Sequence, residues 1–160
     1  MTKKIPALEL VRDFQQMHRE DWDYEWGASS DDTVDCSGAF VWAYRQRGLS
    51  IYHGSNRIAR VNVERLIAYA EAAANGLIVP GMAAFKVHLP GTSGYDLSSQ
   101  YKPGGVRYNG DVGDYCNTTF GAADENGVRT FTNTSSNCQW IRISGVFGTN
   151  PIVTVGEIIG

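Results

Sequence analysis

The sequence predicts a single α+β domain in which N-terminal helices pack on a mostly antiparallel β-sheet. Helical periodicity dominates before Pro80-Gly81, and beyond this point glycine and aromatic residues become frequent while that periodicity disappears. The length supports one domain, because 160 residues can bury one hydrophobic core and are too few for two comfortable ones. We therefore expect one domain over residues 1–160.

An amphipathic helix is predicted over residues 6–20. Apolar side chains recur there at every third position, a spacing typical of one helix face: Leu8, Val11, Phe14 and Met17. We expect this helix to cover the core without taking part in the chemistry.

A central, largely buried helix is predicted over residues 36–48. Asp35 is a favourable N-cap residue, and the run ends with arginine residues and Gly48, as helix C-termini often do. The stretch 39–44 is apolar on all sides, which is more than a surface helix needs.

A third helix and several strands complete the predicted fold. The helix covers residues 63–74 and stops at Asn75-Gly76. An Asn126-Gly127 turn of the hairpin type precedes one of the strands. The predicted strands are Met82–His88, Val128–Thr132 and Gln139–Ile143.

The charge pattern gives no reason to expect nucleic acid as a partner. The net charge is -3, and lysine and arginine form no run. The first 14 residues lack the uninterrupted apolar core of a signal peptide, and no stretch is long enough to span a bilayer. We therefore expect a protein made in the cytoplasm, which reaches any target outside the cell by another export device or by lysis.

The three cysteines leave at least one thiol outside any internal disulfide. Cys36 is the candidate for that thiol. Cys116 and Cys138 could pair with each other, but we expect them as two buried thiols of a reducing compartment. The cysteines show no paired metal-ligand spacing, so we expect no metal site. No phosphate-binding glycine signature is present, and we expect no cofactor.

Cys36 is a candidate nucleophile because of its place just inside a predicted helix N-terminus. Exposed backbone N–H groups and the positive end of the helix dipole favour a thiolate there. The small Ser37-Gly38 pair would let a substrate carbonyl approach the sulfur closely. A small buried cysteine is the alternative interpretation, and position alone does not separate the two.

Two motifs decide between them. Tyr24-Glu-Trp-Gly27, a polar loop and Asp35-Cys-Ser-Gly38 resemble the NlpC/P60 family of bacterial cell-wall peptidases. The resemblance extends from Asp21 to Tyr115 and includes segments similar to a branch found in gut bacteria and their phages: Ile51–Asn56, Pro80–Phe85 and Gly110–Tyr115. It implies a papain-like fold with an N-terminal helix (1–20), a best-matched region (21–115) and divergent C-terminal strands (116–160).

The resemblance also implies roles for individual residues. Cys36 would be the nucleophile, Tyr24 would place its hydroxyl near the oxyanion, and Asp35 with Ser37 would hold the free amino end of a stem peptide. Such sites cleave the bond between D-glutamate and a diamino acid in peptidoglycan. The simpler alternatives are that Tyr24 is a packed aromatic residue and that Asp35 only caps the helix.

The histidine that serves as general base in the family has no counterpart at the expected place. It should open a strand of His-hydrophobic-Gly type after Tyr115, where this chain reads Cys116–Gly121. Asn117 stands nearest that place, and an amide cannot act as a base at neutral pH.

Other polar residues receive weaker assignments. His18 is expected as a solvated surface group and His88 as the end of a strand. His53 and Ser55 lie in a segment that borders the cleft in relatives, so they are expected to contact substrate or to pack the loop. Asn133 is a candidate orienting residue, with a solvent-facing strand position as the alternative.

Two functions therefore stay open. The first is a cysteine hydrolase of peptidoglycan stem peptides, encoded by a bacterium or a prophage. The second is an impaired enzyme or phage structural module that binds wall peptides, with aromatic residues lining a groove: Trp22, Trp26, Tyr52, Tyr95 and Tyr101. An imidazole within hydrogen-bond reach of the Cys36 sulfur would favour the first.

Overall fold

A computed structural model describes residues 5–55, 58, 66–87, 116–133, 138–143 and 152–154. The helices in this part are α1 (Ala7–Arg19), α2 (Gly38–Arg45) and α4 (Tyr69–Ala74). The strands are β1 (Asp23–Tyr24), β2 (Ser29–Ser30), β3 (Thr33–Val34), β4 (Leu66–Ala68), β5 (Ala83–Val87), β6 (Cys116–Ala122), β7 (Arg129–Thr132), β8 (Gln139–Arg142) and β9 (Ile152–Thr154).

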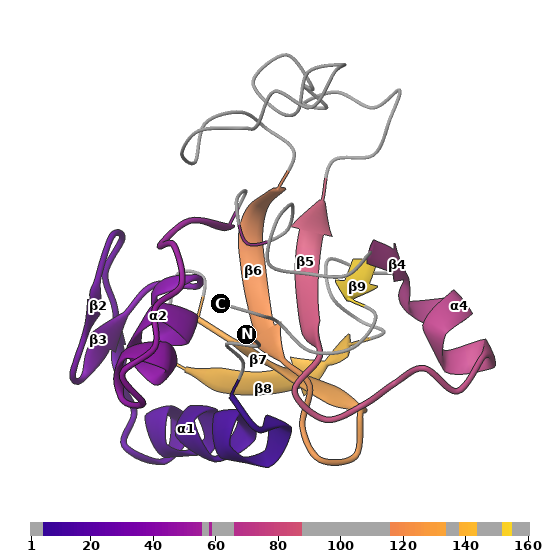
Figure 1. The fold of residues 1–160 in the computed structure, drawn as a ribbon, viewed down its shortest axis with the longest axis horizontal. Coiled ribbons are helices and arrows are strands. Elements are labelled where there is room, and N and C mark those ends of the chain that lie inside the picture. The colour runs from indigo at the N-terminus through magenta and orange to yellow at the C-terminus, as the bar shows by residue number, and fades with distance from the viewer. Residues whose placement is uncertain are drawn as a thin grey trace.

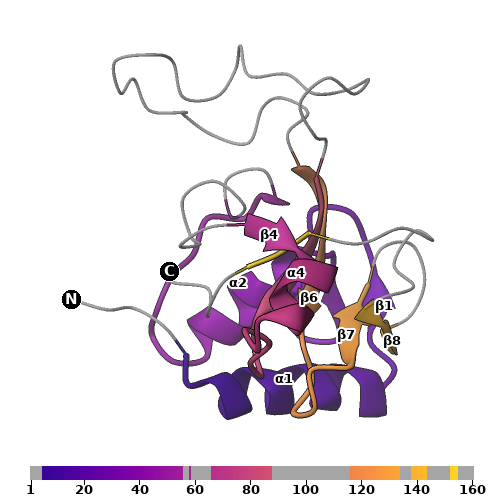
Figure 2. The same cartoon turned by 90° about the vertical axis from the view of Figure 1, so that its right-hand side faces the viewer.

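The main sheet has the strand order β4-β9-β5-β6, and every neighbouring pair in it is antiparallel. An Ala123↔Thr130 bridge links the end of β6 to the antiparallel pair β7-β8. In Figure 1, α2 and α4 lie at opposite ends of the four-stranded sheet, and both ribbon views show α1 across the bottom of the molecule (Figures 1 and 2). This mixture of helices and antiparallel strands confirms the predicted α+β class.

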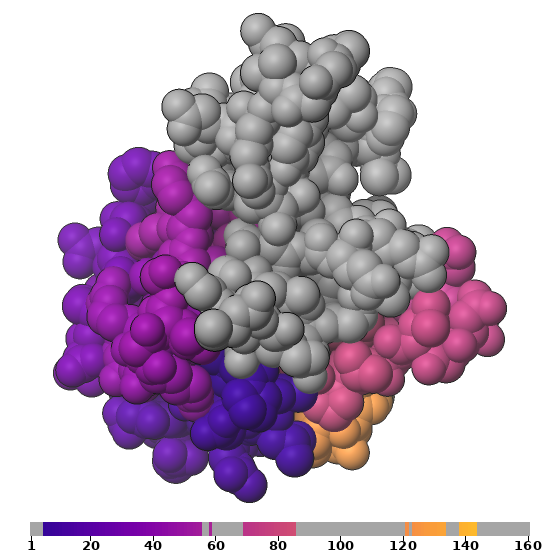
Figure 3. Space-filling view, viewed as in Figure 1, coloured from indigo at the N-terminus to yellow at the C-terminus, as the bar shows by residue number. Residues whose placement is uncertain are grey.

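A third, small sheet lies beside α2: β1 contains Tyr24 of the first motif, and the Asp35–Gly38 motif follows β3 directly. β1 pairs in parallel with β3, and β3 pairs in antiparallel with β2. The N-terminal segment that contains α1, this sheet and α2 forms one continuous side of the space-filled molecule, in indigo and purple (Figure 3).

Helix α1 matches its prediction in extent but differs in one residue of its buried face. Val11, Phe14 and Met17 are buried as predicted, whereas Leu8 is 52% exposed and Leu10 is buried. A strict spacing of three rotates by about 60° per step on an α-helix, so four such positions cannot share one face. Leu10 therefore occupies the core position for which Leu8 was predicted.

Aromatic side chains join α1, α2 and β7 in one core. The Phe14 ring stacks on Phe131 with centroids 4.5 Å apart and meets Phe40 edge-on at 5.1 Å. Trp22 meets Trp42 edge-on at 4.9 Å. These contacts fix α2, which follows Cys36, on a packed support.

The predicted helix over residues 63–74 is only partly correct. Residues 66–68 form β4, which pairs with β9, and α4 begins at Tyr69; residues 63–65 lie outside the described part. Pairing with a distant strand overrides the local helical pattern here. The predicted stop is confirmed, because the Asn75 N–H closes the last turn and Gly76 adopts a left-handed φ of 65°.

The strand predictions are confirmed at β5, β7 and β8. The Asn126-Gly127 turn is also confirmed, and its organiser is a residue that the sequence analysis missed. The buried Asp124 carboxylate accepts hydrogen bonds from the backbone N–H groups of Asn126, Val128 and Arg129. An aspartate two residues before Asn-Gly is the sequence signal that could have identified it.

Candidate active site

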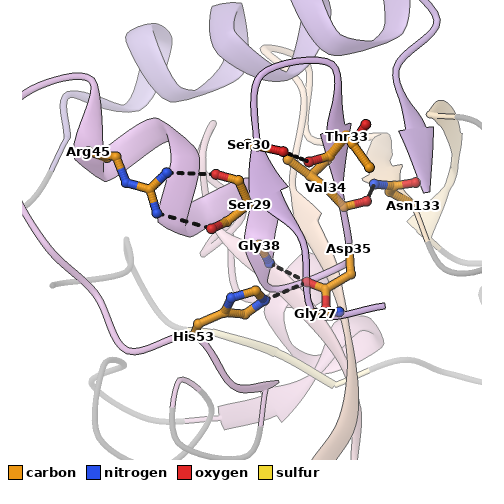
Figure 4. Close-up of polar contacts among 10 residues, drawn as sticks. All are labelled: Gly27, Ser29, Ser30, Thr33, Val34, Asp35, Gly38, Arg45, His53 and Asn133. Atoms are coloured by element: carbon orange, nitrogen blue, oxygen red, sulfur yellow. Dashed lines mark hydrogen bonds and ion pairs between the residues drawn. The ribbon is translucent and has the colours of Figure 1, made fainter. Parts of the chain in front are cut away.

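The Asp35 carboxylate lies between the two motif segments and joins them. Its Oδ2 accepts the Gly27 N–H at 2.7 Å, and its Oδ1 accepts the Gly38 N–H at 2.7 Å. The His53 ring donates from Nε2 to the same Oδ1 at 2.8 Å (Figure 4). Because a carboxylate only accepts hydrogen bonds, the His53 proton must lie on Nε2.

These contacts make Asp35 the N-cap of the helix, as predicted. The Asp35 carbonyl accepts the Ala39 N–H while its side chain accepts the Gly38 N–H, which is the capping pattern. Regular α2 begins at Gly38, two residues later than predicted, although Ser37 already has helical dihedrals. Cys36 therefore lies in the first turn after the cap.

Gly38 is required by close packing at this turn. A Cβ at this position would overlap the Ala28 carbonyl oxygen and would lie 2.7 Å from Asp35 Oδ1. The Ala28 carbonyl is itself the acceptor for the Asp35 N–H at 3.0 Å. The Gly27 and Ala28 backbone and the helix start thus interlock, and a side chain at residue 38 would separate them.

Three donors, from Gly27, Gly38 and His53, surround the Asp35 carboxylate and form what we call the Asp35 cage. These donors set the pKa of the carboxyl. Burial alone would raise the pKa of the Asp35 carboxyl, but hydrogen bonds from His53, Gly27 and Gly38 outweigh it and hold that pKa below its ordinary value of 3.8. Asp35 is therefore an anion at neutral pH.

Cys36 lies between two buried neighbours and is itself partly exposed. Asp35 is 6% exposed and Ser37 is 4% exposed, whereas Cys36 is of intermediate exposure. Its place at a helix N-terminus favours the thiolate.

Tyr24 is electrostatically coupled to Cys36. Burial raises the pKa of the Tyr24 hydroxyl, and the negative charges of Cys36 and Asp35 raise it further. The hydroxyl is therefore protonated at neutral pH and remains a hydrogen-bond donor.

Side chains that the sequence analysis did not select hold the β2-β3 hairpin on α2. The Arg45 guanidinium donates to the Ser29 carbonyl at 2.7 Å and to the Ser29 hydroxyl at 3.0 Å (Figure 4). The Trp42 indole donates to the Asp31 carboxylate at 2.6 Å. These pairs could not be predicted from the local sequence, because each forms only when the hairpin folds back over the helix.

Asn133 supports the same strand from the other side. Its Nδ2 donates to the Val34 carbonyl at 2.6 Å, and the residue is 1% exposed, so it is not a solvent-facing strand residue. The Val34 carbonyl can only accept, so the Asn133 amide orientation is fixed and its buried Oδ1 faces away. Asn133 therefore positions the strand that leads to Cys36.

Two of the three histidines and Ser55 lie in the described part of the chain. His53 is partly exposed and hydrogen-bonded to Asp35, and Ser55 is buried in the same segment. His18 is on the exposed side of α1, where its Nδ1 donates to the Cys138 carbonyl at 2.9 Å. His88 and the Asn117 side chain lie outside the described part of the chain.

Cys138 is more deeply buried than Cys36. It is 1% exposed, and its Sγ contacts the Trp22 carbonyl at 3.6 Å. Burial, followed by the charges of Asp21 and Asp23, raises the pKa of this thiol to about 12. The Cys116 side chain lies outside the described part.

Two negative results concern only the residues that the structure describes. No group of three or more His, Cys, Asp or Glu side chains there could hold a metal ion. None of the helices in that part is long and apolar enough to cross a membrane.

A comparison with known protein families finds a match over residues 21–90. The sequence profile described as "NlpC/P60 family" covers this range. Residues 21–90 match the NlpC/P60 family. The resemblance drawn from the two motifs is thereby confirmed over residues 21–90, and this range contains the Asp35 carboxylate with its three donors.

Solved structures extend the NlpC/P60 likeness in fold to nearly the whole chain. NlpC1 from Trichomonas vaginalis superposes with a TM-score of 0.57 at 16% identity, covering 99% of this chain and 47% of its own. NlpC2 from the same organism gives 0.57 at 15% identity, with 99% and 50% covered. The chain thus spans about half the length of these proteins, and at this identity the likeness concerns the fold alone. A search of curated proteins found no match.

Proposed function

We propose that this protein is a hydrolase of peptidoglycan stem peptides with Cys36 as its nucleophile. The observation that carries the proposal is the position of Cys36, a residue of intermediate exposure, in the first turn after a caged Asp35. The NlpC/P60 match over residues 21–90 supports a cell-wall peptidase as the class of enzyme. The resemblance favours the bond between D-glutamate and a diamino acid as the target.

The local groups support the first half of such a reaction. The Cys36 thiolate attacks the scissile carbonyl, and the carbon–nitrogen bond breaks as the leaving amine takes up a proton from solvent water. The protonated Tyr24 hydroxyl can donate a hydrogen bond to the developing oxyanion. Water then hydrolyses the thioester and releases the carboxylate product and the thiol.

Exposed aromatic side chains next to the cage offer contacts for the remainder of the substrate. Trp26, which precedes the Asp35-bound Gly27, is 86% exposed, and Tyr52, which precedes His53, is 43% exposed. Large aromatic rings in water beside a reactive group suit stacking on peptide or sugar surfaces. The proposed setting is the bacterial cell wall, reached after export or lysis.

A binding module on the same site is the second candidate. It is favoured by the contacts of the two described imidazoles, because His53 donates to Asp35 and His18 donates to the Cys138 carbonyl. Amide hydrolysis needs an acid that protonates the leaving amine, and each of these two rings already uses one nitrogen in a hydrogen bond elsewhere.

The test is digestion of purified muropeptides, followed by mass spectrometry of the fragments. The wild-type protein, Cys36→Ala and Cys138→Ser are compared at equal concentration. Cleavage by the wild type and by Cys138→Ser, but not by Cys36→Ala, would support the hydrolase, and the fragment masses would identify the bond. Binding of muropeptides without cleavage would establish the binding module instead.

A further inference from the structure

The His53 ring lies against the turn that contains Cys36. Its Nε2 donates to Asp35 Oδ1 at 2.8 Å, and the Gly38 N–H donates to the same oxygen at 2.7 Å. Figure 4 shows both dashed lines ending on this oxygen. The ring is thus two hydrogen bonds away from the backbone of α2, and the His53 side chain is 27% exposed, so it is accessible from solvent.

The bond to Asp35 decides which nitrogen of the His53 ring carries a lone pair. Because the carboxylate holds the ring proton on Nε2, the Nδ1 atom of the neutral ring has a lone pair and no proton. A carboxylate that accepts the other N–H also stabilises the imidazolium that forms when the lone pair takes up a proton. His53 therefore has a fixed tautomer and a stabilised protonated form, which suit a general base.

The charges around Cys36 require a cation once its thiol ionises. Asp35 is an anion at neutral pH, and the negative charges of Cys36 and Asp35 both act on the Tyr24 hydroxyl. A thiolate beside this carboxylate adds a second negative charge to a partly buried site, which is unfavourable without a compensating positive charge. Among the described residues that donate to the Asp35 side chain, His53 is the one that can become positive. Transfer of the thiol proton to this ring supplies the missing charge.

We propose that His53 is the general base and general acid of the Cys36 reaction, an assignment that rests on the proposed function and replaces solvent water as the proton donor. Nδ1 takes the proton from the Cys36 thiol, and the thiolate attacks the scissile carbonyl. The imidazolium gives this proton to the leaving amine as the carbon–nitrogen bond breaks. Nδ1 then takes a proton from the water that attacks the thioester, and the sulfur receives it as the carbon–sulfur bond breaks.

Alkylation of Cys36 tests the proton transfer without any substrate. Iodoacetamide rates at Cys36 are measured by peptide mapping at pH 6 and pH 9 for the wild type, His53→Ala and His53→Gln. His18→Ala is the matched control, since the His18 ring donates to the Cys138 carbonyl instead. His53→Gln retains an N–H donor for Asp35 but has no base.

We expect the ratio of the pH 6 rate to the pH 9 rate to fall by about tenfold or more in both His53 variants, because the thiolate loses its cation. The ratio should stay at the wild-type value in His18→Ala. A wild-type ratio in His53→Ala, or restoration of the ratio by His53→Gln, would overturn the assignment.

Turnover of purified muropeptides gives the second test. kcat/KM should fall by about 100-fold or more in both His53 variants, while Kd, measured with each substitution combined with Cys36→Ala, should change by less than about threefold. Recovery of kcat/KM in His53→Gln would show a merely structural role and overturn the assignment. No cleavage by the wild type, together with the expected alkylation ratios, would remove the hydrolase and keep His53 as the proton acceptor of Cys36.

Discussion

At the scale of single residues, Asp35 organises the site around Cys36. Its cap on α2 could be predicted from sequence, because N-cap chemistry is local: an acceptor side chain meets an N–H three residues ahead. Its other partners could not be predicted in this way. Gly27 and His53 are 8 and 18 residues away, and the loops that bring them together exist only in the folded chain.

Replacement of Asp35 by asparagine should destabilise the protein by about 2–4 kcal/mol. The substitution removes a buried, hydrogen-bonded charge and places an amide N–H against one of three donors. Urea denaturation at pH 7 measures the loss. Asp32→Asn is the matched control, since Asp32 is exposed in the same hairpin with a left-handed φ of 70° that asparagine tolerates. Equal stability of the two variants would contradict the cage.

The contribution of Asp35 to stability should also depend on pH. Its pKa is lowered in the folded state, so the contribution is fully present above the ordinary value of 3.8 and is lost as the pH falls through the lower folded value. The difference in unfolding free energy between the wild type and Asp35→Asn should therefore shrink below pH 3.8. Urea titrations at pH 6 and pH 3 measure it, and an unchanged difference would show that the charge is not responsible.

The two described thiols should differ strongly in reactivity. Iodoacetamide at pH 8 should label Cys36 at least about 100-fold faster than Cys138, which is buried and has a pKa raised to about 12. Peptide mapping by mass spectrometry gives both rates in one sample, and denatured protein provides the control in which both react. Comparable native rates would mean that Cys138 is accessible in solution.

At the scale of elements, the start of α2 depends on the hairpin that folds over it. The Ala28 carbonyl occupies the space that a side chain on residue 38 would need, and Arg45 with Trp42 holds the hairpin in place. Asn133, which directly follows β7, donates a hydrogen bond from its amide to the Val34 carbonyl and holds it in place. The geometry at Cys36 is thus set by contacts on both sides of its strand.

Gly38→Ala should destabilise the fold by about 2 kcal/mol or more, although alanine ordinarily stabilises a helix relative to glycine. The reason is the overlap of the new Cβ with the Ala28 carbonyl oxygen. Gly48→Ala, where nothing lies within 4 Å, should cost only the strain of its left-handed φ of 69°, about 1–2 kcal/mol. The rate of Cys36 alkylation should change in Gly38→Ala and not in Gly48→Ala. A Gly38→Ala variant that is more stable than the wild type would contradict the close packing at residue 38.

Elements with a strong local pattern could be predicted from sequence, and those that depend on distant pairing could not. The extents of α1, β7 and β8 follow from apolar periodicity and turn residues. β4 was expected as helix because its partner, β9, lies more than 80 residues along the chain. Leu8 is a separate case, since a strict spacing of three rotates around the helix, so that Leu10 and not Leu8 faces the core.

At the scale of the molecule, the site is built on a rigid support. The contacts of Phe14 with Phe40 and Phe131 join α1, α2 and β7, so the helix that follows Cys36 cannot move without disturbing the core. The NlpC/P60 match covers the motif-bearing part of this support. The central claim of the proposed function is that Cys36, held on this support, is a nucleophile pre-organised for attack.

The release of new amino groups from purified muropeptides tests this claim most directly. The wild-type protein and Cys36→Ala are compared at equal concentration, after their unfolding curves have shown equal folding. We predict release by the wild type and at least about a 100-fold lower rate for Cys36→Ala. Equal rates in the two proteins, or no release by a wild-type protein that binds the muropeptides, would contradict Cys36 as the nucleophile of a wall-peptide hydrolase.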